Sequence, residues 1–333
     1  MAVKVSVIVP VYNMEKYMGV CLDSIISQTL KSIEVVCIND GSSDSSLDIL
    51  NQYHEKDERV KVFNQVNMGV SYARNRGLKN AEGEFVCFMD PDDFYPENNV
   101  LENLYNKAIE NNALICGGSF SRYDNGKIIT EFEGDYKKYT FTKEGMVDYR
   151  DYQFDFGYHR FLYNRKFLID NDINFPPYRR CQDPPFFVKA MITAGKFYAV
   201  PQVVYRYRKG IQAKPASWPT QKFYDMLHGY LDDLVMAKDN KLELLHTLTV
   251  KRIEDDYVLK PSLDKIMNED YQLCSIFAKI NSEIDSGLLL KDKMDFVTDG
   301  YYLLKEFREL AGRVKDTNNL LKIERGKNSR KAK

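Results

Sequence analysis

Long hydrophobic runs are missing from this sequence of 333 residues. A membrane-spanning helix needs ~18 consecutive apolar residues, and the apolar run Val5–Tyr12 is already interrupted by Ser6 and Pro10. The N-terminus has no basic segment followed by a long apolar one, so we expect no secretory signal. These absences predict a cytoplasmic protein.

An excess of either charge is missing as well. The 47 Lys and Arg residues nearly balance the 48 Asp and Glu residues, so the formal net charge is −1. This balance excludes a globally basic nucleic-acid-binding protein, and we expect no nucleic-acid partner. Because 44% of the residues are apolar, the chain can bury a core and is not intrinsically disordered. Its length predicts about two domains.

Clusters of metal-binding cysteine and histidine are also missing. The six cysteines form no C-x-x-C pair and there are only four histidines, which disfavours a structural zinc site. A chain of this size needs no disulfides. We interpret the cysteines as small buried residues: Cys21, Cys37, Cys87, Cys116, Cys181 and Cys274.

Two glycine-rich phosphate-binding signatures are absent. The chain has neither G-x-x-x-x-G-K-[ST] nor G-x-G-x-x-G after its first apolar run. Without such a backbone cradle for phosphates, a nucleoside triphosphatase and a nicotinamide-dependent dehydrogenase are both disfavoured. The run is followed instead by Pro10, Val11, Tyr12 and Asn13, which suit packing against a flat base.

The first 120 residues alternate between strand and helix patterns. The predicted strands are residues 4–9, ending at Pro10, and residues 33–38, 60–63, 85–89 and 113–116. Between them, apolar residues at spacings of three and four predict helices. These are Glu15–Gln28, a helix capped by Ser42 or Ser43, Val70–Leu78, and a helix bearing Leu101, Leu104, Tyr105, Ala108 and Ile109. The alternation predicts an α/β fold with a mostly parallel sheet flanked by helices.

The pattern changes near residue 120. Asn125-Gly126, between Ser119–Tyr123 and Lys127–Phe132, predicts a β-hairpin. From about Pro219, apolar stripes predict a C-terminal helical region. The stripes are Phe223, Leu227, Tyr230, Leu231 and Leu234; Leu273, Phe277, Ile280 and Ile284; and Tyr301, Leu304 and Phe307. We therefore divide the chain into residues 1–120, 121–215 and 216–333.

Polar loops follow four of the predicted strands: Pro10–Asn13, Asn39–Asp44, Asn64–Gly69 and Asp90–Asp93. In open α/β sheets, ligands bind beyond the carboxyl ends of the strands, so we expect these loops to form the site. The last loop places three carboxylates within four residues. Such carboxylates repel each other unless a divalent cation lies among them, which predicts Mn²⁺ or Mg²⁺. The alternative is an acidic turn that caps a following helix.

These loops resemble the motifs of the family 2 glycosyltransferases. The resemblance is carried by VSVIVPVYNMEKYMGVCLDSIISQT, VVCINDGSSDSS, NMGVSYARNRGL and GEFVCFMDPDD, and more weakly by YHRFLYNRKFL, FPPYRRCQDPPFF and VVYRYRKG. It implies a GT-A (Rossmann-like) fold with a nucleotide-sugar-binding core in residues 1–120 and an acceptor-side part with the catalytic base in residues 121–215. Bacterial members often build surface polysaccharides. The region after about residue 215 lies outside the resemblance.

The resemblance implies roles for five residues that would bind the nucleotide sugar. Pro10, Tyr12 and Asn13 would line the base and ribose. Asp40 would accept a hydrogen bond from the base, which favours uracil, and Arg74 would approach the phosphates or the sugar. Taken alone, Asp40 is an ordinary turn aspartate and Arg74 is a surface ion pair on a helix.

Asp90 and Asp92 match the family's D-x-D motif. By resemblance, Asp92 would bind the metal that bridges both phosphates. Asp90 would hold ribose or sugar hydroxyls, and Asp93 would support them.

Asp183 stands at the position of the catalytic base. Related enzymes usually carry Glu-Asp there, followed by aromatic residues, whereas this chain has glutamine at Gln182 and then Asp183-Pro184-Pro185. The alternative interpretation is that Asp183 caps a helix from Phe186, since Pro is favoured at the first helical position. The two interpretations are compatible.

Each of three further residues has two alternative interpretations. Arg206 and Arg208 either face the leaving diphosphate or alternate along a half-buried strand. His159 is either an additional metal or acceptor contact, or simply packs beside Tyr158 and Phe161.

These residues lead us to expect an inverting, metal-dependent glycosyltransferase of the hexosyltransferase type, active in polysaccharide or glycolipid biosynthesis. Its partners would be a UDP-sugar donor and a saccharide or lipid-linked saccharide acceptor. One alternative is a sugar-nucleotide pyrophosphorylase, which needs a glycine-rich signature with Lys or Arg where this chain has PVYNMEKY. The other is a non-catalytic UDP-sugar-binding protein, for which Gln182 is the only hint.

The C-terminus carries a basic tail: Lys322, Arg325, Lys327, Arg330, Lys331 and Lys333. Each basic residue near an anionic bilayer contributes ~1 kcal/mol before screening by salt. Several such residues together could hold the protein loosely at the inner face of the membrane, although no Trp or Phe accompanies the charges. The alternative is a frayed, solvated tail.

Overall fold

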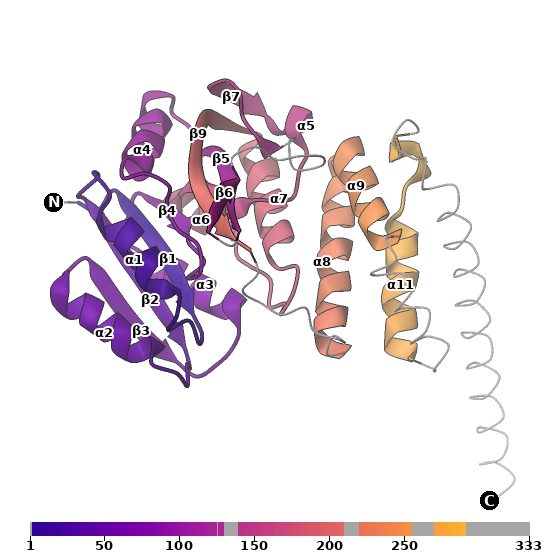
Figure 1. Cartoon of the computed structure of the whole chain (residues 1–333). Coiled ribbons are helices and arrows are strands. Elements are labelled where there is room, and N and C mark those ends of the chain that lie inside the picture. The colour runs from indigo at the N-terminus through magenta and orange to yellow at the C-terminus, as the bar shows by residue number, and fades with distance from the viewer. Residues whose placement is uncertain (1, 125, 130–138, 210–219, 255–269, 291–333) are drawn as a thin grey trace, which may run out of the picture. The chain divides into compact units, whose positions relative to one another are not determined.

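The computed structural model describes residues 2–124, 126–129, 139–209, 220–254 and 270–290 (Figure 1). The chain separates into two compact units, Met1–Met226 and Leu227–Lys333. Each unit has its own architecture, and the first contains all the predicted site residues.

The first half of the sheet consists of four parallel strands. They are β1 (Val5–Val11), β2 (Ile33–Asp40), β3 (Val60–Gln65) and β4 (Phe85–Phe88), in the order β3-β2-β1-β4. In the register, Val5 lies opposite both Ile33 and Phe85. Because all four strands run the same way, their carboxyl ends lie at one edge of the sheet, as the sequence predicts.

β1 does not end at Pro10, as expected from the sequence, but continues through it to Val11. Proline lacks the N–H that a central strand needs. In a parallel strand, the backbone N–H and C=O groups of residues two apart point to the same neighbouring strand. Ile8 O accepts from Met89 N on the β4 side, so the backbone of Pro10, two residues later, also points to that side. The missing N–H of Pro10 faces that same side, where pairing with β4 has ended at Phe88.

Helices cover both faces of these strands. α1 (Met18–Ile26), α2 (Ser46–Lys56) and α4 (Val100–Glu110) share a core with Val7 and Val9 of β1, whereas Ile8 points to α3 (Val70–Asn80) on the other face. A Cβ at Gly77 would lie 2.3 Å from Ile8 Cγ2, so only glycine lets α3 approach β1 this closely. On α4 the predicted stripe is buried except at Ile109, which is exposed because it falls at the edge of the buried face.

Two helix starts differ from the expectation. α1 begins at Met18 rather than Glu15, and the Glu15 carboxylate instead accepts a hydrogen bond from Ser45 N at 3.0 Å. The N-cap of α2 is Ser45 rather than Ser42 or Ser43. The Ser45 side chain forms no capping hydrogen bond, and Glu15 reaches this helix end from another loop.

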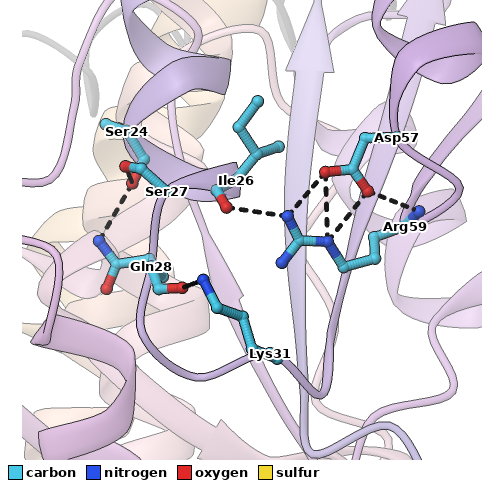
Figure 2. Close-up of polar contacts among 7 residues, drawn as sticks. All are labelled: Ser24, Ile26, Ser27, Gln28, Lys31, Asp57 and Arg59. Carbon is cyan, nitrogen blue, oxygen red and sulfur yellow. Dashed lines mark hydrogen bonds and ion pairs between the residues drawn. The ribbon is translucent and has the colours of Figure 1, made fainter.

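Two cations hold the C-terminal end of α1 (Figure 2). Arg59 Nη2 donates to Ile26 O at 2.8 Å, and Lys31 Nζ donates to Gln28 O at 2.9 Å. Asp57 fixes the Arg59 guanidinium through hydrogen bonds of 2.6–3.2 Å. Positive charge stabilises a helix C-terminus, whose last carbonyls have no partner within the helix. Since Arg59 directly precedes β3, this contact ties α1 to the start of that strand.

The second half of the sheet is mixed. It contains β5 (Ile115–Asp124), β6 (Lys127–Ile129), β7 (Gly145–Asp148), β8 (Phe161–Asn164) and β9 (Lys196–Arg208), and the order continues β4-β8-β5-β9-β7. β8 is antiparallel to β4 and β5, and β7 to β9, whereas β9 runs parallel to β5. The predicted hairpin forms: Asp124 pairs with Lys127, although Asn125 and Phe132 lie outside the described residues.

Short helices connect these strands: α5 (Tyr149–Tyr152), η2 (Tyr158–Arg160), α6 (Arg165–Asp170) and α7 (Asp183–Ala194). An aromatic layer joins them to the sheet. Phe88 of β4 lies 5.0 Å from Phe175 and 5.4 Å from Phe186, whose rings stack at 3.9 Å. α7 therefore packs on the same buried face of β4 as the aromatic segment that precedes it.

The helical region begins with α8 (Thr220–Asp239), which starts in the first unit, and continues with α9 (Glu243–Glu254), α11 (Tyr271–Glu283) and η3 (Ser286–Leu288). Phe223, Leu227 and Leu234 are buried on α8, as predicted, while Leu231 is half-buried. The expected stripe at Tyr301 lies outside the described residues. None of the helices in the described ranges combines the length and apolar content that crossing a bilayer requires.

Four of the cysteines in the described part of the chain are free thiols. Cys21, Cys37, Cys87 and Cys116 are buried as predicted, and Cys181 is half-buried. The Cys274 side chain lies outside the described residues.

Candidate active site

The loops that follow β1 and β2 meet at the carboxyl edge of the parallel strands. Asn13 Oδ1 accepts from Ser43 N at 2.8 Å, and Asn13 N donates to Ser42 Oγ at 3.1 Å. These bonds fix Asn13 at a left-handed φ of 54°. Pro10 is buried in β1, and Tyr12 is 47% exposed at the edge. The structure thus brings together the residues predicted to line the base and ribose, and their role stays a prediction.

Asp40 lies buried at the end of β2. Its Oδ1 accepts from Gln65 Nε2 at 2.7 Å and from Met68 N at 2.8 Å, and its Oδ2 accepts from Gly69 N at 2.9 Å. Asp40 is therefore more than an ordinary turn residue, because it holds the loop between β3 and α3. A hydrogen bond to a base stays a prediction.

The acidic loop after β4 is fixed by β9. Tyr205 OH donates to Asp93 Oδ2 at 2.7 Å and accepts from Asp90 N at 3.2 Å. Arg208 N donates to Asp93 Oδ1 at 2.7 Å, and Arg208 Nε donates to Asp92 O at 2.8 Å. The next helix, α4, begins only at Val100, so the loop does not cap a helix. Both oxygens of Asp93 are engaged by the protein, which suits a supporting role.

Arg74 links α3 to this acidic loop. Its Nη2 lies 2.7 Å from Asp90 Oδ1, and its guanidinium lies 4.9 Å from the Tyr158 ring and 5.1 Å from the Phe175 ring. Arg74 is only 4% exposed, so it is not a surface ion pair. Its Nε and Nη1 are buried without a hydrogen-bond partner among the described residues. Two nitrogens of this buried cation therefore keep unused hydrogen-bonding capacity within the described part of the chain.

Asp183 is the first residue of α7, and its N-cap is Gln182. The interpretation of Asp183 as the cap of a helix from Phe186 is therefore wrong. The helix can start earlier because Pro184 and Pro185 lie in its first turn, where backbone N–H groups have no partner within the helix. Asp183 is half-buried and interacts electrostatically with Arg74 and Asp90. The proposed base and the buried cation thus share one site.

Burial and neighbouring charges separate the pKa values of three carboxyl groups. Burial raises the pKa of Asp183, against the opposing effect of Arg74. Burial and the charge of Asp90 raise the pKa of Asp92 to about 6. Burial would also raise the pKa of Asp90, but Arg74 outweighs it and holds that pKa below its ordinary value. Asp90 is thus the stable anion of the site, while Asp183 has the higher proton affinity that a general base needs.

Side chains alternate along the end of β9. Arg206 and Arg208 lie against the Phe94 ring, at 5.5 and 5.2 Å, whereas Tyr205 packs on His159 with ring centroids 4.1 Å apart. Both arginines lie on a half-buried strand, as one interpretation holds, and a contact with diphosphate stays a prediction. His159 is buried, and burial lowers its pKa to about 3. It is therefore a neutral ring packed among aromatic residues.

Asp92 is the carboxylate best suited to a divalent cation. It forms no ion pair with any residue that the structure describes. Groups of three or more His, Cys, Asp or Glu arranged for a metal ion are also not found in the described ranges. Mg²⁺ commonly uses only one or two carboxylates and completes its shell with water and substrate phosphates. Asp92, with the second oxygen of Asp90, fits such an ion.

Sequence reasoning missed Tyr158 and Tyr205 at this site. Tyr158 OH donates to Asp90 Oδ1 at 3.3 Å across 68 residues of sequence, and Tyr205 contacts Asp90 N across 115 residues. Both tyrosines stand in the weaker resembling segments, YHRFLYNRKFL and VVYRYRKG. Their presence there is the only signal that pointed to them.

Comparison with known proteins agrees with this geometry. The model of the family "Glycosyl transferase family 2" matches residues 6–171. The chain is 31% identical over 250 residues to the putative glycosyltransferase EpsH of Bacillus subtilis, which covers 72% of this chain and 71% of EpsH. The chain therefore belongs to glycosyl transferase family 2.

A second relative matches a shorter stretch. Glycosyltransferase GlyA of Streptococcus pneumoniae is 46% identical over 124 residues, which are 37% of this chain and 18% of GlyA. The chain thus spans less than two thirds of GlyA.

The fold also matches that of a solved structure. S. aureus TarS 1-349, crystallised in complex with UDP-GlcNAc, superposes with a TM-score of 0.72 at 22% identity, covering 94% of this chain and 92% of that one. The GT-A fold expected from the sequence is confirmed.

Proposed function

We propose that this protein is an inverting, metal-dependent hexosyltransferase that moves a sugar from a UDP-linked donor to an acceptor hydroxyl. The observation that carries the proposal is the meeting of Arg74, Asp90 and Asp183 at the carboxyl edge of the parallel strands. One cation, one stable anion and one carboxylate of raised pKa are the groups that a single displacement needs.

The donor side is built from the loops after β1, β2 and β4. Tyr12 and Asn13 are exposed at the edge where the base and ribose would lie. The free N–H groups of Arg74 would donate to the diphosphate or the sugar. Asp92 and Asp90 would hold Mn²⁺ or Mg²⁺, and that ion supplies positive charge against the charge that develops on the diphosphate. The UDP-GlcNAc complex of TarS supports a UDP-linked donor.

The acceptor side contains the base. The acceptor oxygen attacks the anomeric carbon and forms the new C–O bond while its proton passes to Asp183. The bond between the anomeric carbon and the diphosphate breaks with its electron pair, and UDP leaves. Because the attacking oxygen and the leaving group stand on opposite faces of the sugar, the configuration inverts.

Asp183→Asn tests the base. The amide keeps the size of the side chain but cannot accept the proton, so we expect transfer to fall by about 10²-fold or more while donor affinity hardly changes. Release of UDP measures transfer, calorimetry measures donor affinity, and NMR of the product gives the anomeric configuration. Asp151→Asn, at an exposed position on α5, is the control.

Four results would contradict the proposal. Near-normal transfer by Asp183→Asn would remove Asp183 as the base, and a retained configuration would remove the single displacement. Pyrophosphate in place of UDP would indicate a pyrophosphorylase. Donor binding without any turnover by the unchanged protein would indicate a non-catalytic sugar-nucleotide-binding protein.

We further propose that the acceptor is a saccharide or lipid-linked saccharide of polysaccharide or glycolipid synthesis. The family assignment supports this class of acceptor. Work on a lipid-linked acceptor would bring the protein to the inner face of a membrane, with the basic tail near the headgroups. The tail itself lies outside the described residues.

A further inference from the structure

One exposed aromatic ring lies beside the carboxylates of the site and has no role in the mechanism above. Tyr207, near the end of β9, is 38% exposed. Its ring is nearly parallel to that of His159, with an interplanar angle of 25° and centroids 6.2 Å apart. His159 is itself buried and neutral. The exposed Tyr207 ring therefore lies against the flat, uncharged and buried ring of His159.

The strand places Tyr207 on the face that carries the acidic loop. Residues two apart on a strand point to the same side, and Tyr205 on that side donates to Asp93. Both tyrosine rings contact His159. His159 thus joins two tyrosine rings, one bonded to the buried acidic loop and the other exposed.

Charged groups from both halves of the site act electrostatically on Tyr207. It interacts electrostatically with Asp90, Asp92 and Asp93 of the acidic loop, and with Arg180, three residues before Asp183. Burial, together with these carboxylates, raises the pKa of Tyr207 to about 12, so the hydroxyl stays neutral at physiological pH. Tyr207 thus combines a partly exposed, neutral ring with electrostatic neighbours in both the acidic loop and the segment before Asp183.

We propose that Tyr207, backed by His159, forms an acceptor subsite on which the apolar face of a pyranose ring stacks. The subsite rests on the proposed transfer reaction. The C–H groups on one face of a pyranose carry weak positive charge, and the face of an aromatic ring is the negative part of its quadrupole. A tyrosine loses little conformational entropy when it binds, because it has only two side-chain torsions. Stacking would hold the acceptor while Asp183 accepts its proton.

The test compares three variants, and its probes are the methyl β-glycosides of glucose, galactose and N-acetylglucosamine. Tyr207→Ala removes the ring, and Tyr207→Phe keeps the ring but removes the hydroxyl. Tyr72→Ala removes a tyrosine that is 45% exposed on α3 and serves as the matched control. Saturation-transfer NMR measures glycoside affinity with the donor bound. Separate assays measure donor affinity and hydrolysis of the donor by water.

We expect Tyr207→Ala to bind the glycosides about tenfold more weakly, the loss that corresponds to one aromatic contact of ~1.4 kcal/mol. Tyr207→Phe and Tyr72→Ala should keep the affinity of the unchanged protein. Donor affinity and donor hydrolysis should be the same in all four proteins, because the proposed role of Tyr207 is to bind the acceptor and not the donor.

Equal glycoside affinity in Tyr207→Ala contradicts the subsite, and so does an unchanged protein that binds none of the glycosides. A loss in Tyr207→Phe as large as in Tyr207→Ala also contradicts it, since the hydroxyl rather than the ring face would then bind. Failure of the transfer reaction is a separate result: it appears as absent donor turnover, whereas the subsite is read from glycoside binding.

Discussion

At the scale of single residues, three neighbouring carboxylates differ in their partners. Asp93 accepts two hydrogen bonds from β9, and Asp90 pairs with Arg74. Asp92 forms no ion pair within the described ranges. Identical side chains thus meet different surroundings: Asp90 forms an ion pair, Asp93 accepts hydrogen bonds, and Asp92 interacts with Arg208 and Arg74 only through longer-range electrostatics.

Asp92→Ala should abolish the dependence of UDP binding on Mn²⁺ while the fold stays intact, because this carboxylate supports no described ion pair. Calorimetric titration of UDP with Mn²⁺, and again with EDTA, measures the dependence. Asp93→Ala is the contrasting variant: it removes the acceptors of two buried hydrogen bonds and should lower thermal stability. If Asp92→Ala binds UDP with the same response to Mn²⁺ as the unchanged protein, the metal assignment is wrong.

The residues recognisable from sequence are those whose motif directly follows a strand. Asp40, Asp90 and Asp92 follow parallel strands, so their presence at one edge could be predicted from the pattern alone. Tyr158 and Tyr205 could not, because their contacts with Asp90 span 68 and 115 residues and leave no local pattern.

At the scale of secondary structure elements, a charged cluster joins β1, β2 and β3 near their amino-terminal ends, away from the candidate site. Glu34 of β2 is 2% exposed and accepts from Ser6 Oγ of β1 at 2.5 Å and from Glu82 N at 2.6 Å. Lys61 of β3 lies 2.7 Å from its other oxygen. Burial would raise the pKa of Glu34, but the hydrogen bonds from Lys61, Ser6 and Glu82 N outweigh it and lower that pKa.

Glu34→Gln should lower the free energy of unfolding by about 2 kcal/mol at neutral pH, because it leaves Lys61 without its buried partner. Since the folded pKa of Glu34 is lowered, its stabilisation is present above the ordinary carboxyl pKa and is lost as the pH falls through the folded value. The two proteins should therefore approach equal stability in acid. Urea unfolding at several pH values measures this, with Glu82→Gln, an exposed partner of Lys61, as control. A stability difference independent of pH would contradict the charge argument.

The arrangement of the strands was predictable where strands that follow one another in the chain, with a helix between them, form one parallel sheet. The parallel half, from β1 to β4, follows from alternating strands and helices. The mixed half does not, because β8 inserts between β4 and β5, and β9 pairs with β5 from about eighty residues away in sequence. A short apolar run carries no information about such distant partners.

At the scale of the whole molecule, the basic C-terminal residues predict electrostatic binding to membranes. The full chain should sediment with anionic vesicles at low salt more strongly than a chain cut after Leu321, since each basic residue contributes ~1 kcal/mol near the surface. The difference should vanish at high salt, which screens the attraction. Equal partitioning of both chains at low salt would exclude the tail as a membrane contact.

The close approach of α3 to β1 at Gly77 concerns more than packing. Arg74 lies three residues earlier on the same helix. The distance between α3 and β1 therefore affects how closely its guanidinium can approach Asp90. A single added methyl group would meet Ile8 of β1, a residue outside the loops that form the candidate site. A mutational library restricted to residues that touch the ligands would omit this position, although the distance across the ion pair depends on it.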